Sequence, residues 1–98
     1  MQSMLRQAQK MQEDMANAQG ELEQREYTAT AGGGMVTATV DGKHLLRSIE
    51  LKPEAVDPDD TEMLSDLIVA AVNEAVRKAQ ADSEETLGKI TGGMQLPF

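Results

Sequence analysis

Two basic side chains near the start of the chain have a spacing suited to binding an anion. Arg6 and Lys10 lie four residues apart, and no acidic residue precedes Glu13. On a helix this spacing places both cations on one face, near the positive end of the helix dipole. Such a face can contact the phosphates of a nucleic acid. The alternative is that Arg6 and Lys10 are solvated surface charges on a long helix.

Further candidates for nucleic-acid contact lie beside this pair and in the last third of the chain. Near this pair only Gln2, Gln7 and Gln9 could hydrogen-bond to base edges, and nothing singles them out, so sequence specificity should be modest. Arg77, Lys78 and Lys89 form a second basic set. Glu74 lies three residues before Arg77, which favours an ion pair within one helix over contact with DNA.

The net charge limits how DNA can be bound. The 98 residues include 9 basic and 17 acidic side chains, a net charge of −8, and a dimer would carry twice that charge. Phosphate repels such a molecule on average. Binding would therefore depend on cations gathered at one place.

Composition argues against catalysis and metal binding. The chain has no Cys and one His, which excludes thiolate metal sites, cysteine nucleophiles and disulfides. Asp57, Asp59 and Asp60 lack the rest of a calcium-binding loop, and they suit a helix start instead. Gly32–Gly34 lacks the Lys-Ser/Thr of a phosphate-binding loop and suits a strand connection. We expect neither an enzyme nor a cofactor, a metal ion or a small-molecule substrate.

The element that would position Arg6 and Lys10 is a helix predicted over residues 2–25. Its apolar residues recur at steps of three and four, as in a heptad seam: Met1, Met4, Ala8, Met11, Met15, Ala18 and Leu22. A helix of this length spans about 35 Å, so part of it should project from a small domain or pair with another helix, such as one from a second copy. The Met-rich seam could alternatively hold protein clients.

The middle of the chain alternates with the period of β-structure. This pattern predicts strands over residues 26–31, 35–40 and 43–51. Three strands with one apolar face cannot stand alone, so another element must cover them.

The last two strands should form a hairpin. Asp41-Gly42 suits a two-residue type I′ turn, which would place Val40 opposite Lys43. One apolar face then combines Val36, Ala38, Val40, Leu45, Ile49 and Leu51. Arg47 interrupts this face, so it should lie at an edge or meet an acidic partner.

A second helix is predicted over residues 60–88, followed by an irregular tail at 89–98. Acidic residues from Asp57 to Glu62 form its start signal. The stretch Leu67–Val72 is apolar on all sides and should pack on both the sheet and a partner subunit. The residues expected between two copies are Leu67, Ile68, Ala71, Val72, Ala75 and Val76. The order of elements predicts an α+β fold in a single domain, residues 1–98.

No segment has the pattern of a secretion signal or a membrane-spanning helix. The longest apolar run covers only residues 67–72, whereas a bilayer needs roughly 20 apolar residues. Residues 1–12 are amphipathic and rich in Gln, unlike a signal peptide. We therefore expect a cytoplasmic protein that does not bind a membrane.

Five segments, in this order, resemble the YbaB/EbfC family of small bacterial nucleoid-associated proteins. They are MLRQAQKMQEDM (4–15), GGGMV (32–36), DGKHLLRSIEL with the following Lys-Pro (41–53), LIVAAVNEAVRKA (67–79) and GKITGGM (88–94). The resemblance implies a homodimer whose helices project from a central sheet like tweezers. It further implies binding of double-stranded DNA, a change in DNA conformation, and a role in nucleoid organisation or gene regulation. Both the first and the last helix would contact DNA, and the protein would reside in the cytoplasm and nucleoid.

Two hypotheses for function follow. The first is a homodimeric DNA-binding protein whose helix ends grip the phosphate backbone. The alternative is a coiled-coil interaction or chaperone-like scaffold that holds protein partners. A scaffold of this kind predicts that the first and last helices zip together within one chain, although Glu74, Arg77 and Lys78 would interrupt the seam.

Overall fold

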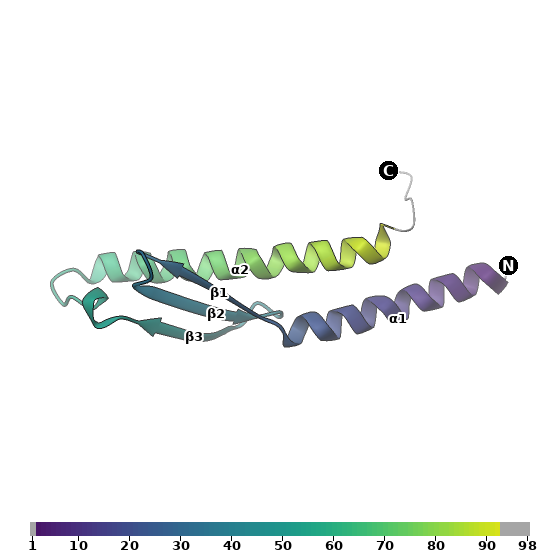
Figure 1. Ribbon diagram of the computed structural model, residues 1–98, viewed down its shortest axis with the longest axis horizontal. Helices are drawn as coiled ribbons and strands as arrows, with labels where there is room; N and C mark the ends of the chain where they lie inside the picture. The colour runs from purple at the N-terminus through teal and green to yellow at the C-terminus, as the bar shows by residue number, and fades with distance from the viewer. Residues whose placement is uncertain (1, 93–98) are drawn as a thin grey trace.

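The chain folds into two long helices and a three-stranded antiparallel sheet, in the predicted order (Figure 1). The computed structural model describes residues 2–92. The elements are α1 (Gln2–Gln24), β1 (Glu26–Ala31), β2 (Val36–Asp41), β3 (Leu46–Leu51), the 3₁₀ helix η1 (Pro53–Ala55) and α2 (Thr61–Thr91). The strands lie in the order β1-β2-β3. The predicted α+β class is confirmed.

The core lies between α2 and the first two strands. α2 presents a stripe of alanines that are at most 1% exposed: Ala71, Ala75 and Ala79. The sheet presents Ala29, Val36, Ala38 and Val40, at most 3% exposed. Small side chains on both surfaces let the helix lie close to the sheet. Leu67 and Ile68 flank the alanine stripe and are half-buried against the same core.

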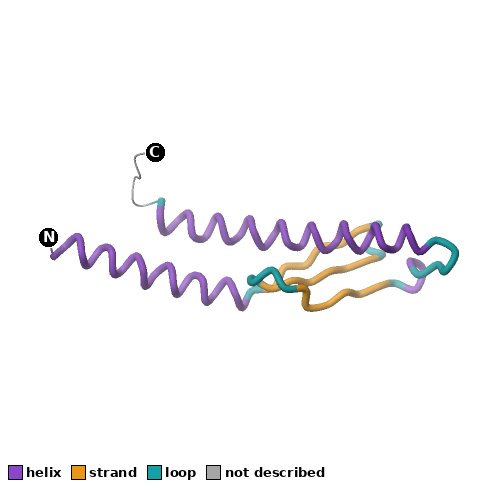
Figure 2. Tube along the Cα trace, turned by 180° about the vertical axis from the view of Figure 1, so that it is seen from behind, coloured by secondary structure: helices purple, strands orange, loops and turns teal. Residues whose placement is uncertain are grey.

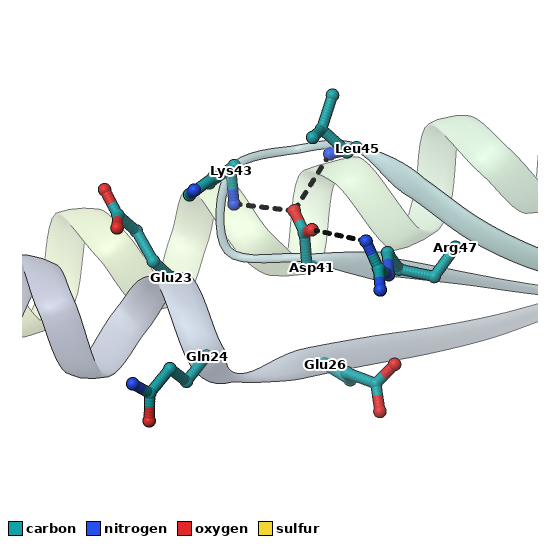
Figure 3. Close-up of a pocket in the computed structure, with 7 residues that line it drawn as sticks. All are labelled: Glu23, Gln24, Glu26, Asp41, Lys43, Leu45 and Arg47. Carbon is teal, nitrogen blue, oxygen red and sulfur yellow. Dashed lines mark hydrogen bonds and ion pairs between the residues drawn. The ribbon is translucent and has the colours of Figure 1, made fainter.

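The connection between β2 and β3 differs from the predicted two-residue turn. The backbone N–H of His44 donates to the carbonyl of Asp41, and His44 itself takes a positive φ of 67°. The Asp41 carboxylate accepts hydrogen bonds from the backbone N–H groups of Lys43 (2.8 Å) and Leu45 (3.1 Å) (Figure 3). These bonds stabilise a longer loop, which ends in a left-handed residue before the strand resumes.

This loop shifts the register of the hairpin. Val36 pairs with Leu51 and Ala38 with Ile49, whereas Val40 pairs with Leu46 and not with Lys43. The predicted shared face is therefore right for Ile49 and Leu51 but wrong for Leu45. Arg47 is the extra residue of a β-bulge on an edge strand, with its guanidinium 3.9 Å from the Asp41 carboxylate.

The helix ends also refine the predictions. α2 begins after Asp60, whose carboxylate caps the backbone N–H of Met63 at 3.2 Å. The helix then continues through Gly88 to Thr91, so the irregular tail predicted from residue 89 does not begin there. A glycine inside a helix costs only about 1 kcal/mol relative to Ala, too little to end a helix that is otherwise regular. Residues 93–98 lie outside the described part of the chain.

The molecule is elongated, with extents of 69 × 26 × 16 Å. α1 and α2 run antiparallel beside each other, and the N-terminal part of α1 extends past the described end of α2 (Figure 2). We call residues 18–24 the root of α1 and residues 2–10 its tip. At the root, Ala18 and Leu22 are buried, whereas every side chain of the tip is exposed. In residues 2–92, neither helix is both long and apolar enough to cross a bilayer.

Candidate nucleic-acid interface

The tip of α1 presents the two cations that the sequence singles out. Arg6 and Lys10 are exposed, and within residues 2–92 neither forms an ion pair. Gln7 is exposed beside them. On the opposite face Met11 and Met15 are half-buried, so the seam is the side turned towards the protein. The tip can therefore offer positive charge to a ligand without first breaking contacts of its own.

The second basic set is engaged within the chain. Arg77 pairs with Glu74 at 3.3 Å, and Lys89 pairs with Glu85 at 3.5 Å. These exposed pairs within one helix are each worth only about 0.3–0.5 kcal/mol, so phosphate could replace either carboxylate.

Lys78 has a different position from its two neighbours in this set. Its ammonium group donates to the backbone carbonyl of Thr28 in β1 at 2.8 Å. The side chain thus covers part of the open edge of the sheet, which would otherwise be able to pair with another strand. This arrangement gives Lys78 a role in the fold, and its contact with DNA stays a prediction.

A polar cluster at the root of α1 is the feature that sequence analysis missed. The Asp82 carboxylate accepts hydrogen bonds from the Arg25 guanidinium (2.8 Å) and the Tyr27 hydroxyl (2.5 Å). The Thr86 hydroxyl donates to its other oxygen at 3.3 Å. Arg25 and Tyr27 precede Asp82 by 57 and 55 residues, so no local pattern could bring them together.

The pKa values in this cluster follow from these contacts. Hydrogen bonds from Tyr27 and then Arg25 hold the pKa of Asp82 below its usual value. Partial burial, followed by the bond to Asp82, raises the pKa of Tyr27. At neutral pH the carboxylate is therefore ionised and the phenol keeps its proton.

A cavity of about 470 Å³ opens beside the same root, between the end of α1 and the β2–β3 hairpin (Figure 3). Its lining residues are Glu23, Gln24, Glu26, Asp41, Lys43, Leu45 and Arg47. Backbone hydrogen bonds from Leu45 and Lys43 lower the pKa of Asp41, so its charge is retained at neutral pH. With three carboxylates against two cations, this cavity does not suit a phosphate group.

The residues predicted between two copies fall into two groups. Ala71 and Ala75 are fully buried against their own sheet, which leaves them no surface for a partner and corrects that part of the prediction. Leu67, Ile68, Val72 and Val76 are half-buried at the margins of the same core. Within the same stretch of α2, Val69 is 57% exposed. Other exposed large apolar side chains lie on or beside β3, namely Leu45, Leu46 and Leu51 at 41–56%.

Comparison with known proteins places this arrangement in a family. The family model described as the YbaB/EbfC DNA-binding family matches residues 1–94. A nucleoid-associated protein of Alkaliphilus metalliredigens is 55% identical over 97 residues, covering 99% of this chain and 85% of that protein. One of Clostridium acetobutylicum is 50% identical over 97 residues, covering 99% and 87%. One of Saccharopolyspora erythraea is 51% identical over 94 residues, covering 96% and 81%.

A solved structure shares the same fold. The crystal structure of an uncharacterized protein from Helicobacter pylori matches with a TM-score of 0.74 at 16% identity, covering 87% of this chain and 89% of that one. At this identity the likeness concerns the fold alone. The family model and the curated relatives carry the assignment further: the chain belongs to the YbaB/EbfC DNA-binding family.

Proposed function

We propose that this protein is a nucleoid-associated protein that binds duplex DNA as a homodimer, mainly through the phosphate backbone, and alters DNA conformation. Its role would be in nucleoid organisation or gene regulation, within the cytoplasm and nucleoid. The observation that carries the proposal is the exposed pair Arg6 and Lys10, which form no ion pair within residues 2–92. Family membership and the names of the curated relatives support it.

The distribution of charge supports approach to DNA by one end of the molecule. Residues 2–12 contain two cations and no carboxylate, whereas residues 53–66 contain six carboxylates and no cation. These two segments lie at opposite ends of the elongated fold (Figure 1). Phosphate would attract the tip of α1 and repel the far end, which reconciles DNA binding with the net charge of −8.

An apolar surface beside β3 supports the homodimer. α2 packs on β1 and β2, and β3 remains an edge strand that this helix leaves largely uncovered. Leu46 and Leu51 face the same side as the core residues they pair with, yet they are 49% and 41% exposed. An exposed leucine-bearing edge invites association, and a second copy is the occupant that is always present.

The dimer has its own test. Leu51→Glu would place a charge within the proposed interface, so we expect sedimentation of the variant at micromolar concentration to show a monomer. Ser48→Glu makes a similar change on the other face of the same strand and should leave the dimer intact. A monomeric wild-type protein, or equal behaviour of both variants, would contradict this interface.

DNA binding is tested by an electrophoretic mobility shift assay at two salt concentrations. If each subunit contributes Arg6 and Lys10, about four phosphates are neutralised, and the affinity should fall roughly 10²-fold between 50 and 200 mM salt. Arg6→Glu combined with Lys10→Glu should abolish the shift and leave the dimer intact. The matched control is Lys43→Glu with Lys52→Glu, which changes the net charge equally on two exposed cations away from the tip. Equal loss in both double variants would refute the tip as the site.

The scaffold hypothesis receives partial support from the packing of the helices. α1 and α2 do pack together within one chain, but only Ala18 and Leu22 at the root are fully buried, and Met11 and Met15 are half-buried. The seam is therefore largely used for packing within the chain, which leaves little of it for holding a client. Absence of any DNA shift at low salt, with an unfolded protein kept soluble in the same buffer, would favour the scaffold.

A further inference from the structure

We infer that Asp82 is a positioning residue for α1: by tying Arg25 and Tyr27 to α2, it fixes the direction in which the tip projects. The consequence for DNA binding rests on the proposed function. The effect on the direction of α1 does not.

The connection between α1 and the sheet is short, and Asp82 forms hydrogen bonds with a residue in it and with a residue of the strand that follows. Arg25 alone separates the end of α1 from the start of β1. Arg25 lies in this connection and Tyr27 lies just inside the strand, and both donate to the same carboxylate oxygen of Asp82. The other oxygen accepts from Thr86, one turn further along α2, which fixes the rotamer of the carboxylate. The root of α1, the first strand and α2 therefore meet at one side chain.

The β2–β3 hairpin supports the same root at a second point. Gly42 lies so close to the last turn of α1 that a Cβ atom there would be 1.7 Å from the backbone oxygen of Leu22. Leu22 itself is 4% exposed. Packing at Leu22 and Gly42 limits how far the root can shift, while the bonds to Asp82 add a directional restraint.

The length of α1 amplifies small changes at this connection. Arg6 precedes Arg25 by 19 residues, which at 1.5 Å per residue is roughly 28 Å of helix. A rotation of about 10° at the root would move Arg6 by roughly 5 Å, more than the 3.4 Å axial spacing of phosphates along one DNA strand. The direction of α1 thus decides which phosphates Arg6 and Lys10 can reach together.

The chain suits a direct measurement of this direction because it contains no Cys. Spin labels at Gln9→Cys on the tip and Gln80→Cys on α2 occupy exposed positions. Diluting the labelled protein with excess unlabelled chain restricts the measured distances to one subunit. Pulsed electron resonance should give one narrow distance in the otherwise wild-type protein and a broadened or shifted distribution in Asp82→Ala. The control is Glu84→Ala, which removes the same charge from an exposed position on α2.

DNA affinity supplies a second measurement, because loss of positioning should weaken binding whereas loss of a negative charge alone should not. Removing one carboxylate makes the protein less acidic, so by charge alone both Asp82→Ala and Glu84→Ala should bind DNA equally or more tightly. We expect Asp82→Ala to bind about 3–10-fold more weakly than Glu84→Ala. This range corresponds to about 0.7–1.4 kcal/mol. Tyr27→Phe removes one of the two bonds and should give a smaller change in the same direction.

The outcomes separate this inference from the proposed function. Identical distance distributions in Asp82→Ala and Glu84→Ala, or DNA binding by Asp82→Ala as tight as by Glu84→Ala, would overturn the positioning role. If the wild-type protein does not bind DNA, the proposed function fails while the distances still decide the role of Asp82. Should Asp82→Ala lose its fold by circular dichroism, the distance distribution in Tyr27→Phe decides in its place.

Discussion

Gly42 offers a sharp test of how the hairpin supports α1. A Cβ atom at this position would lie 1.7 Å from the backbone oxygen of Leu22 and 2.4 Å from its carbonyl carbon. Carbon and oxygen atoms normally stay about 3.3 Å apart, so Gly42→Ala must push the last turn of α1 away by roughly 1.5 Å. Both obstructing atoms belong to the backbone, so no rotamer change relieves the clash. Overpacking of this kind costs about 1–3 kcal/mol.

Thermal unfolding at fixed protein concentration measures this cost. A loss of about 2 kcal/mol lowers the Tm of a domain of this size by roughly 8–16 °C. Gly20→Ala is the matched control, because nothing lies within 4 Å of a Cβ atom there and the residue is inside α1. That change should stabilise the helix by about 0.5–1 kcal/mol. Gly42→Asn distinguishes the observed loop from a type I′ turn. In a type I′ turn residue 42 would have a positive φ, which Asn tolerates, so the Tm would change little. In the observed loop the Cβ atom of Asn meets the backbone of Leu22, so the Tm should fall as it does in Gly42→Ala. Equal Tm values for Gly42→Ala and Gly20→Ala would refute the close approach.

Two further predictions concern single contacts. Because the pKa of Asp82 in the folded protein lies below its ordinary value of 3.8, the stabilising contribution of this carboxylate is present above that pH and is lost as the pH falls through the folded pKa. Asp82→Asn should therefore flatten the decline of Tm between pH 5 and 2 (a range set by about two units around an ordinary Asp pKa), and an unchanged decline would contradict this. Lys78→Met removes the bond to the Thr28 carbonyl and should cost about 1 kcal/mol in urea unfolding, whereas Arg77→Met should cost less than about 0.5 kcal/mol. Equal costs would show that the bond to Thr28 does not stabilise the fold.

Local patterns predicted the elements well and their contacts less well. The heptad and alternating patterns placed both helices and all three strands close to their observed positions. Asp41-Gly42 correctly marked the hairpin, but the reason for Gly42 is the backbone of Leu22, which lies 20 residues earlier. The side chain of Asp41 stabilises a longer loop than the two-residue turn predicted. As a result Val40 pairs with Leu46 and not with Lys43. Turn propensity alone does not include either contact.

The apolar segment of α2 shows a second limit. A helix that is apolar on all sides must be covered on more than one side, but the pattern does not say which residues face which cover. Ala71 and Ala75 face the sheet of their own chain because only small residues permit the close helix–sheet approach. Larger residues such as Ile68 lie at the margins, half-buried. Residue size would have been a better guide to the inner face than position in the apolar run.

The candidate site differs from these contacts, because it depends on side chains that point away from the protein. Arg6 and Lys10 are exposed and form no ion pair within residues 2–92, although Glu13 and Asp14 follow Lys10 at helical spacing. Their contact with DNA stays a prediction. What local sequence does not show is how the tip is held. A helix of nine exposed residues would be marginal in water by itself, so the tip depends on continuing a helix whose root is buried at Ala18 and Leu22. It follows that two kinds of substitution should weaken DNA binding in distinguishable ways. Changes at the tip remove phosphate contacts and reduce the salt dependence of affinity, whereas changes at Asp82 should lower affinity and leave most of the salt dependence in place.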